Sequence, residues 1–173
     1  MRRLDVQDSS TQGQALIEFA LVLPLLLVLI VNVVNFGAFF FAWITVANAA
    51  RSGAQYMSMG GASVGAPRAA ASTQIYNLIT ADISSLQNST SVAVRVCSKK
   101  YGVAAVCSSM GSGSFGDPMP DTRNEAPLFV MGWVDVSYTY TPPIPGFSFP
   151  SLGVYSTLPP LTIHRQSVMR LIQ

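Results

Sequence analysis

Charged residues are scarce in this chain. Asp, Glu, Lys and Arg make up 10% of its 173 residues, and the formal net charge at pH 7 is only +2. The ten Lys and Arg residues are scattered, so there is no basic patch to neutralise phosphates, and we expect no nucleic-acid partner. Half of the residues are apolar and the mean hydropathy is +0.40. This composition excludes a soluble disordered protein.

Histidine and cysteine are almost absent. His164 is the only histidine, and Cys97 and Cys107 are the only cysteines, so the usual zinc-ligand sets cannot be assembled. We expect no metal and no cofactor. The two cysteines flank a turn at Lys99–Gly102, which favours a disulfide across a β-hairpin in an oxidising compartment. A pair of free buried thiols is the alternative.

A long segment lacks charge altogether. No charged residue occurs from Phe19 to Ala50, and Ala15–Val31 is apolar apart from Glu18. Because about 20 such residues cross a bilayer as a helix, we expect a transmembrane helix that begins near Ala15. A carboxylate inside a membrane segment is costly and by default marks function. The alternative is that Glu18 reaches the headgroups from the first turn of the helix.

The sequence predicts one helix of about 40 residues in total, which begins in the bilayer, continues past the membrane and stops at Gly60-Gly61. Aromatic residues at 36–43 are typical of a membrane interface. One apolar stripe then comprises Trp43, Ala47, Ala50, Ala54 and Met57. The opposite face carries Asn48, Arg51, Ser52 and Gln55. Bends or close helix contacts are expected at Pro24, Asn32, Asn35 and Gly37.

The remaining sequence predicts one small α+β domain. Pro67–Gln87 has helical periodicity, with Ala71, Ile75, Leu78, Ile79 and Ile83 on one side. Alternating residues predict strands at Ser91–Cys97, Leu128–Tyr140 and Leu161–Ile172, with a possible fourth at Gly102–Cys107. The inward residues would be Val92, Val94, Val96, Val130, Val134, Val136, Tyr138, Tyr140, Leu161, Ile163, Met169 and Leu171. Two long connections rich in Gly and Pro, Ser108–Pro127 and Thr141–Pro160, separate the strands.

Candidate catalytic and binding motifs are weak. Gly61–Gly65 matches the G-x-S-x-G elbow around Ser63, with His164 downstream, but that motif requires a preceding buried strand. A helix precedes it here, so a turn is the better interpretation and we expect no enzyme. Asn88-Ser89-Thr90 matches a glycosylation sequon by chance. Four oxygen-bearing residues lack the spacing of a calcium loop and are interpreted as a solvated loop: Asp117, Asp121, Asn124 and Glu125.

The start of the apolar helix resembles a known processing site. Gly13 followed by Glu18-Phe19 at the mouth of a Leu- and Val-rich helix resembles type IV-like prepilins, which a membrane peptidase cuts after the glycine. GQALIEFALVLP (residues 13–24), the Phe36-Gly37 pair and NAAR followed by GA (residues 48–54) resemble the TadE-like pseudopilins of tight-adherence pili. The resemblance covers about a quarter of the chain.

This resemblance implies a pilin-like organisation. Residues 1–13 would be a cytoplasmic leader, 14–35 the transmembrane helix, 36–60 its extramembrane continuation and 61–173 a periplasmic or extracellular domain. Arg2 and Arg3 agree weakly with a cytoplasmic amino terminus. Signal-peptide cleavage at Ala47–Ala49 is disfavoured because the apolar run before it is too long.

The implied function is that of a minor pseudopilin-like subunit of a tight-adherence, type IVb-like pilus in the bacterial inner membrane. Cleavage after Gly13 would free the amine of Gln14, and Glu18 would pair with such an amine on a neighbouring subunit. The implied partners are a prepilin peptidase, other pilins and pseudopilins, the pilus assembly platform and the lipid bilayer. The alternative is an uncleaved single-pass envelope protein that acts as a binding or assembly factor.

Overall fold

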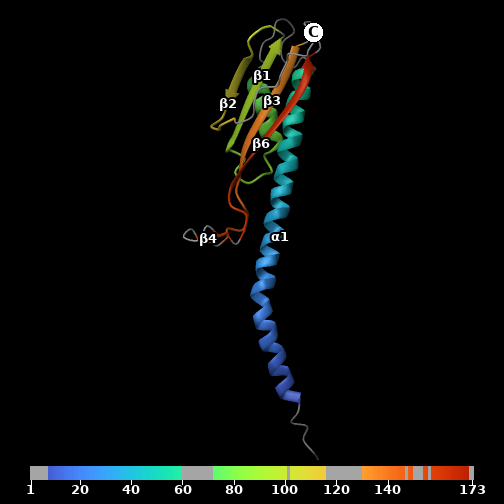
Figure 1. Cartoon of the computed structure of the whole chain (residues 1–173). Helices are drawn as coiled ribbons and strands as arrows, with labels where there is room; N and C mark the ends of the chain where they lie inside the picture. The colour runs from blue at the N-terminus through green and yellow to red at the C-terminus, as the bar shows by residue number, and fades with distance from the viewer. Residues whose placement is uncertain are drawn as a thin grey trace, which may run out of the picture. The chain divides into compact units, whose positions relative to one another are not determined.

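The fold is α+β, as the sequence predicts (Figure 1). The computed structural model describes residues 8–59, 72–100, 102–115, 130–146, 148–149, 154–155 and 157–171. Two helices and six strands follow in the order α1 (Asp8–Ser58), α2 (Ser72–Asp82), β1 (Val92–Lys100), β2 (Val106–Met110), β3 (Val130–Tyr140), β4 (Ser148–Phe149), β5 (Val154–Tyr155) and β6 (Leu161–Leu171). The chain divides into two compact units, one of Met1–Gly37 with Ile144–Pro159 and the other of Ala38–Pro143 with Pro160–Gln173.

The larger unit contains a four-stranded antiparallel sheet in the order β2-β1-β3-β6. All three predicted strands are present, and the possible fourth forms as β2, four residues later than expected. The smaller unit contains a two-stranded pair, β4 and β5, inside the segment that the sequence analysis treats as a long connection.

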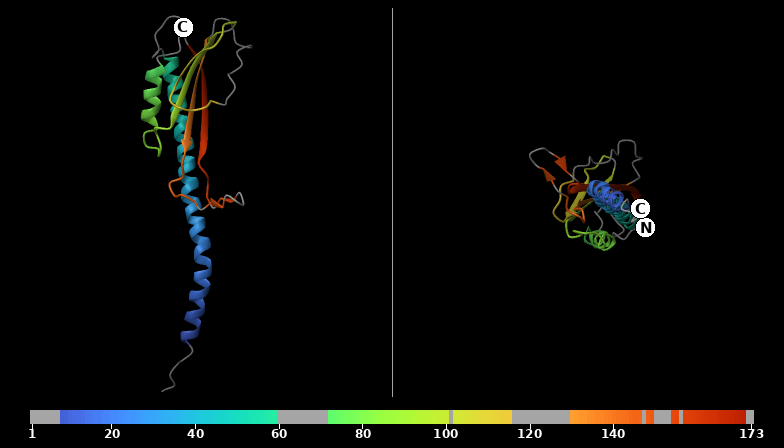
Figure 2. Two further views of the ribbon diagram at one scale, coloured as in Figure 1. Left: turned by 90° about the vertical axis from the view of Figure 1, so that its left-hand side faces the viewer. Right: turned by 90° about the horizontal axis from the view of Figure 1, so that it is seen from below.

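One face of the large sheet packs against α2 and the carboxyl-terminal part of α1 (Figure 2). The valines of β1 and the Val134–Tyr140 face of β3 contribute to this core, as predicted. The side of α1 that enters the core is confirmed from Ala50 onward, but it begins differently. Ala42 and Val46 are buried, whereas Trp43 is 38% exposed and Ala47 is only partly buried. The predicted stripe is therefore one position off at its start. Trp43 instead packs beneath the guanidinium group of Arg165, whose carbon lies 3.6 Å from the centre of the ring.

Gly53 of α1 lies against two isoleucine side chains of α2. A Cβ atom added at Gly53 would lie 3.0 Å from Cδ1 of Ile79 and 3.2 Å from Cγ2 of Ile75. Both isoleucines are fully buried. The α1–α2 contact is therefore packed without spare volume at residue 53.

The ends of both helices differ from the prediction. α1 extends back at least to Asp8 and therefore starts earlier than the predicted position near Ala15. α2 ends at Asp82 rather than Gln87, and tight turns continue to residue 90. Ile83 and Leu86 are still buried through these turns. Within these turns, Asn88 has a positive φ of 60° and donates a hydrogen bond from its side-chain amide to the carbonyl of Thr139.

The second face of the sheet is also buried in part. Asp135 and Ser137 on β3 are only 2% and 4% exposed. A Cβ added at Gly113 would contact the side chains of Ala93 and Ser137, so the segment after β2 crosses this face. By contrast, Leu161, expected inside, is 37% exposed at the first position of β6. The prediction for Leu128 lies outside the described residues.

Candidate functional site

The residues proposed for processing lie in the first turns of α1. Gly13, Gln14 and Glu18 are all exposed, and a Cβ added at Gly13 would meet nothing within 4 Å. The side-chain amide of Gln14 donates a hydrogen bond to Oε1 of Glu18 over 3.2 Å. The carboxylate therefore lies one turn from the peptide bond that joins Gly13 to Gln14. The Glu18 side chain could equally reach a cationic group at position 14.

The helix that follows carries apolar side chains that the described part of the chain leaves exposed. Gly13–Ser58 contains a window with a mean hydropathy of 2.7, none of it buried within the protein, and it is long and apolar enough to cross a membrane. Most large apolar side chains from Leu16 to Ile44 are exposed, among them Leu21 at 73% and Leu25 at 70%. A single-pass membrane segment is compatible with this surface.

Residues 13–55 match the family model of TadE-like proteins. This segment is similar to TadE-like proteins. The match begins at Gly13, the residue proposed for cleavage, and ends within the part of α1 that packs against the sheet. It therefore covers the Gln14–Glu18 pair and the whole apolar surface. The TadE-like family points to a pseudopilin-like protein related to the tight-adherence pilus. No curated protein and no solved structure gives a significant match.

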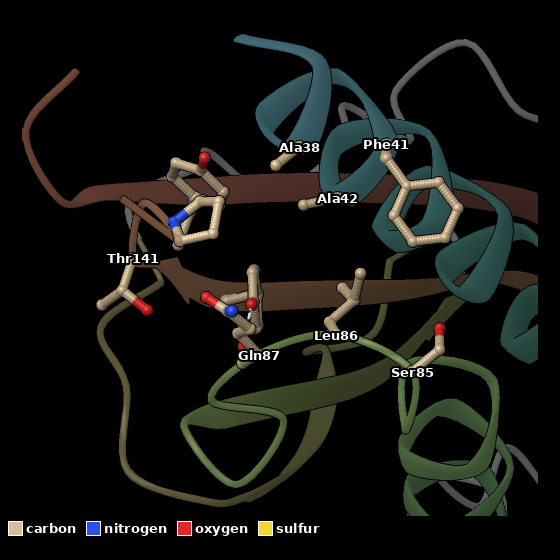
Figure 3. Close-up of a pocket in the computed structure, with 10 residues that line it drawn as sticks. Ala38, Phe41, Ala42, Ser85, Leu86, Gln87 and Thr141 are labelled. Atoms are coloured by element: carbon tan, nitrogen blue, oxygen red, sulfur yellow. Dashed lines mark hydrogen bonds between the residues drawn. The ribbon is translucent and has the colours of Figure 1, made fainter. Parts of the chain in front are cut away.

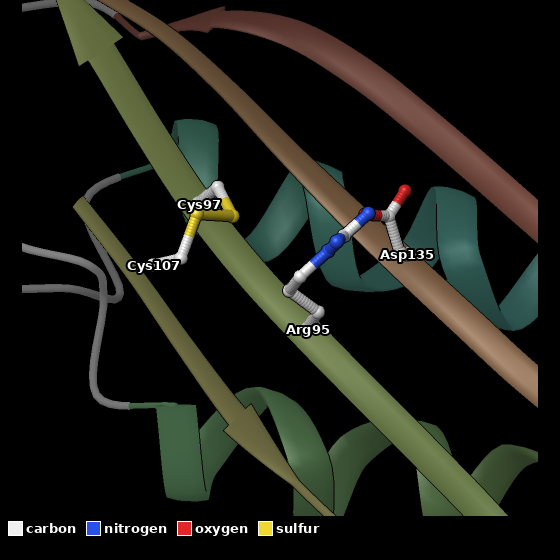
Figure 4. Close-up of polar contacts among 4 residues, drawn as sticks. All are labelled: Arg95, Cys97, Cys107 and Asp135. Carbon is white, nitrogen blue, oxygen red and sulfur yellow. A yellow bond between two sulfur atoms is a disulfide. The ribbon is translucent and has the colours of Figure 1, made fainter. Parts of the chain in front are cut away.

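The disulfide between Cys97 and Cys107 is confirmed (Figure 4). The two residues are direct partners in the antiparallel register of β1 and β2, with a Cα–Cα distance of 4.1 Å. β2 is an edge strand and pairs only with β1 in the described sheet. The disulfide therefore ties the edge strand β2 to β1. Without it, only backbone hydrogen bonds would link the two strands.

An ion pair missed by the sequence analysis lies on the same face of the sheet (Figure 4). Arg95 and Asp135 are register partners on β1 and β3, and Nη2 of the arginine is 2.6 Å from Oδ2 of the aspartate. The aspartate side chain is 4% exposed and the arginine 17%. The ring of Phe115 lies 4.8 Å from the guanidinium carbon. The alternating pattern of residues 128–140 places Asp135 on the polar face of its strand, and this pattern gives no indication that the carboxylate is buried.

Asn35 was also assigned the wrong kind of contact. The sequence favours a helix bend or a helix–helix contact at this position, but the side chain binds a backbone segment instead. Its Nδ2 donates to the carbonyl of Ile144 over 2.9 Å, and its Oδ1 accepts from the Ile144 amide over 3.2 Å. Asn35 is fully buried. We call this two-bond contact the Asn35 clamp. A polar residue within an apolar helix indicates that it needs a polar partner, but the sequence does not indicate which segment supplies that partner.

One small pocket lies beside α1 in the larger unit (Figure 3). Its volume is about 140 Å³, well below the roughly 300–1,000 Å³ of typical ligand sites. Tyr138 lines it and donates its hydroxyl hydrogen bond to the carbonyl of Gln87. Burial, and to a lesser extent the nearby Tyr140, raises the pKa of Tyr138, and burial raises that of Tyr140. The pocket has the size of a packing defect rather than of a substrate site.

The remaining candidates give no site. His164 is partly exposed and faces Ser137 across the β3–β6 register. Ser63 of the G-x-S-x-G motif lies outside the described residues, as do the four candidate calcium ligands, Asp117, Asp121, Asn124 and Glu125. Within the described ranges, no three His, Cys, Asp or Glu side chains gather in a way that could hold a metal.

Proposed function

We propose that this protein is a minor pseudopilin-like structural subunit of a tight-adherence pilus or a related envelope assembly, processed by a prepilin peptidase after Gly13. The observation that carries the proposal is the coincidence of three features in one helix. The TadE-like match starts at Gly13, Glu18 lies one turn from Gln14, and the apolar surface beyond them is uncovered.

In this proposal the bilayer surrounds the first part of α1. Residues 14–35 would span about 33 Å at 1.5 Å per residue, close to the 30 Å of a hydrocarbon core. The exposed Leu, Ile and Val side chains of this part would then contact lipid or the helices of other subunits. Residues 36–60 would continue outside the membrane and carry the α+β domain on the periplasmic side. The partners would be other pilins and pseudopilins and the assembly platform.

Glu18 would act by pairing with an amine of a neighbouring subunit. Between Asp8 and Arg51 it is the only charged residue. An unpaired carboxylate costs about 2.5–3.5 kcal/mol at mid-bilayer and less near the surface. Cleavage after Gly13 would create an ammonium group on Gln14, and in an assembly the carboxylate of one helix would neutralise the amine of the next. Such a pair would fix the axial register between subunits.

The role would be packing rather than catalysis. The described part of the domain offers a small pocket beside α1, a disulfide that fastens an edge strand and a buried ion pair. The disulfide and the ion pair link neighbouring strands of the sheet, and the pocket is too small for a typical substrate. Ser63→Ala should therefore leave assembly unchanged, whereas a membrane-tethered hydrolase would lose its activity.

The test uses Glu18 variants in cells that produce the complete assembly system. Glu18→Leu should enter the membrane at least as well as the native protein and should still be cut, but assembly of surface pili should be lost. Ile17→Leu, a neutral change at the exposed neighbouring position, is the matched control and should assemble normally. Normal pilus assembly by Glu18→Leu would contradict the proposal and favour an uncleaved single-pass anchor that acts as a binding factor.

A further inference from the structure

Arg165 of β6 is stacked on Trp43 of α1, although the two residues are distant in sequence. The guanidinium carbon lies 3.6 Å from the centre of the indole ring. Phe39, one turn earlier on α1, packs against the same indole at a centroid distance of 5.8 Å and against the ring of Tyr140 on β3 at 5.5 Å. The indole that carries the arginine is therefore itself held by aromatic contacts. We call the two residues the Trp43–Arg165 pair.

The guanidinium group finds no acceptor within the described residues. Its Nε atom is buried without a hydrogen-bond partner. Val136, the register partner of Arg165, belongs to the core between the sheet and the helices, so the arginine side chain lies on that face of the sheet. Asp135 is one position away and therefore lies on the opposite face, where it pairs with Arg95. No carboxylate in the described part of the chain neutralises Arg165.

An arginine in this arrangement is suited to an external oxyanion. A guanidinium group stacked on an aromatic face is stabilised by the ring and keeps its N–H groups in one plane, where two of them can bind the oxygens of a phosphate or a carboxylate. Arg165 is only partly buried, so an anion can reach it. Because a buried donor without an acceptor lowers stability, an anion that supplies the acceptor would be bound favourably.

The exposed surface around the pair is apolar. Phe40, Phe41 and Ile44 are each 57% or 58% exposed, and they lie within one turn of Trp43. Aromatic side chains at the end of an uncharged apolar helix are typical of the level of the lipid headgroups. Arginine is also frequent at that level, since its charged end can reach the headgroups while its stem contacts apolar groups. This setting favours a lipid phosphate as the anion.

The position of the pair along α1 agrees with this level. Trp43 follows Asn35, the end of the proposed hydrocarbon segment, by eight residues, which corresponds to about 12 Å of helix. The headgroup region on each side of a bilayer is roughly 5–8 Å thick. Helix side chains are tilted toward the amino terminus, which here brings the indole ring closer to the lipid. The stacked guanidinium group is therefore within reach of lipid phosphates.

A second copy of the chain is a poorer source of the anion. Residues 36–59 and 157–171, the parts of α1 and β6 that surround the pair, contain no Asp and no Glu. In a symmetric dimer the same surface would meet itself. Two such surfaces would bring arginines together without a carboxylate between them.

We propose that the Trp43–Arg165 pair binds the phosphate of an outer-leaflet lipid, with the guanidinium group as the hydrogen-bond donor and the exposed apolar side chains beside it against the lipid. This inference rests on the membrane position of α1 proposed above. Since Arg165 belongs to β6, an edge strand of the four-stranded sheet, the lipid would tie the sheet to the membrane surface and restrict the movement of the domain relative to the bilayer.

The experiment measures the contact between arginine carbons and lipid phosphorus by solid-state NMR. Full-length protein with ¹³C in the guanidinium carbon of arginine is reconstituted into phosphatidylcholine vesicles in a phosphate-free buffer, so that all phosphorus belongs to lipid. A guanidinium carbon next to a phosphate loses signal through its dipolar coupling to ³¹P. Arg165→Lys tests the pair, and Arg170→Lys, on the same strand, is the matched control.

Arg165→Lys should remove one arginine carbon from the part of the signal that ³¹P attenuates, whereas Arg170→Lys should remove one from the part that it does not attenuate. Trp43→Leu keeps every arginine and should abolish the attenuation at Arg165. Phe40→Leu, at an exposed aromatic position on the same helix, should retain it. Attenuation at Arg165 that persists in Trp43→Leu would overturn the pair as the binding site.

A separate label distinguishes this inference from the proposed membrane position. Cys97 and Cys107 are joined, so Leu25→Cys can carry the only thiol-linked fluorophore, and a nitroxide deep in the acyl chain should quench it. Quenching at 25 without ³¹P attenuation at Arg165 would overturn this inference alone, whereas no quenching at 25 would overturn the membrane position of the helix as well. Dipolar contact between Arg165 and a carboxylate carbon of a separately labelled second copy would assign the guanidinium group to a protein partner and would also overturn the inference.

Discussion

The packing of α1 against the domain leads to a prediction with a matched control on adjacent residues. Ala54 is 1% exposed, and Gln55, the next residue, is exposed. Leucine at position 54 adds three carbon atoms at a position that the core already surrounds. Overpacking of this kind costs about 1–3 kcal/mol. An exposed substitution such as Gln55→Leu changes stability by at most about 0.5 kcal/mol.

These energies convert into a measurable difference in melting temperature. For a domain of this size, 1 kcal/mol corresponds to roughly 4 °C. We therefore expect Ala54→Leu to lower the Tm of the domain by roughly 4–12 °C and Gln55→Leu to change it by about 2 °C or less. The assay is thermal unfolding of the full-length protein in detergent, followed by near-ultraviolet circular dichroism, which reports the packing around the buried Trp133. Equal shifts for the two variants would refute the packing of this part of α1 against the sheet and α2.

Three further predictions concern the sheet and its core. Arg95→Met should lower the free energy of unfolding in urea by about 3 kcal/mol because it leaves the carboxylate of Asp135 buried and unpaired. The double variant Arg95→Met/Asp135→Leu should lose less of this free energy than the single variant. An equal or larger loss in the double variant would contradict the argument. The mass of the intact protein measured without reductant should be lower than that of the reduced form by two hydrogens. Reduction of Cys97–Cys107 should lower the free energy of unfolding by about 3 kcal/mol. Alkylation of both thiols without reductant would contradict the disulfide. Burial raises the pKa of Tyr138 above its ordinary value of 10.0, so the hydroxyl keeps its proton to a higher pH in the folded state than in the unfolded state. The stability that the protonated Tyr138 contributes is therefore complete below pH 10 and is lost as the pH rises through the folded pKa. Tyr138→Phe should make the decrease of Tm with rising alkaline pH smaller. If the decrease is unchanged, groups other than Tyr138 cause it.

The parts of the fold that the sequence predicts correctly depend on regular periodicity. Val92, Val94 and Val96 alternate, and a one-residue slip would move all three to the wrong face of the sheet. Their burial was therefore predictable. The disulfide was predictable for a similar reason, since two cysteines on either side of a short turn are brought opposite each other by the hairpin itself.

The parts that were missed depend on contacts between distant segments. Nothing near Asn35 in the sequence indicates that its amide binds Ile144, which lies 109 residues away. Asp135 looks like a solvent-facing strand residue until Arg95 is placed opposite it by the β1–β3 register. Trp43 was expected inside on grounds of hydrophobicity, yet the smaller Ala42 enters the core because close packing of a helix on a sheet favours a small side chain there.

The candidate site was accessible from the sequence because it is local. Gly13, Gln14 and Glu18 lie within two turns of one helix, so their spacing alone brings the carboxylate near the proposed cleavage point. The hydrogen bond from Gln14 to Glu18 agrees with this arrangement. Whether the peptide bond is cut is a matter of chemistry performed by another protein, and no spacing within this chain determines it.

The central claim is tested most directly by the amino-terminal sequence of the protein extracted from membranes of cells that contain the assembly system. Our account predicts that the mature chain begins at Gln14, and that a variant with a larger residue in place of Gly13 retains residues 1–13. A native membrane form that begins only at the uncut start would contradict processing and would favour the uncleaved envelope protein.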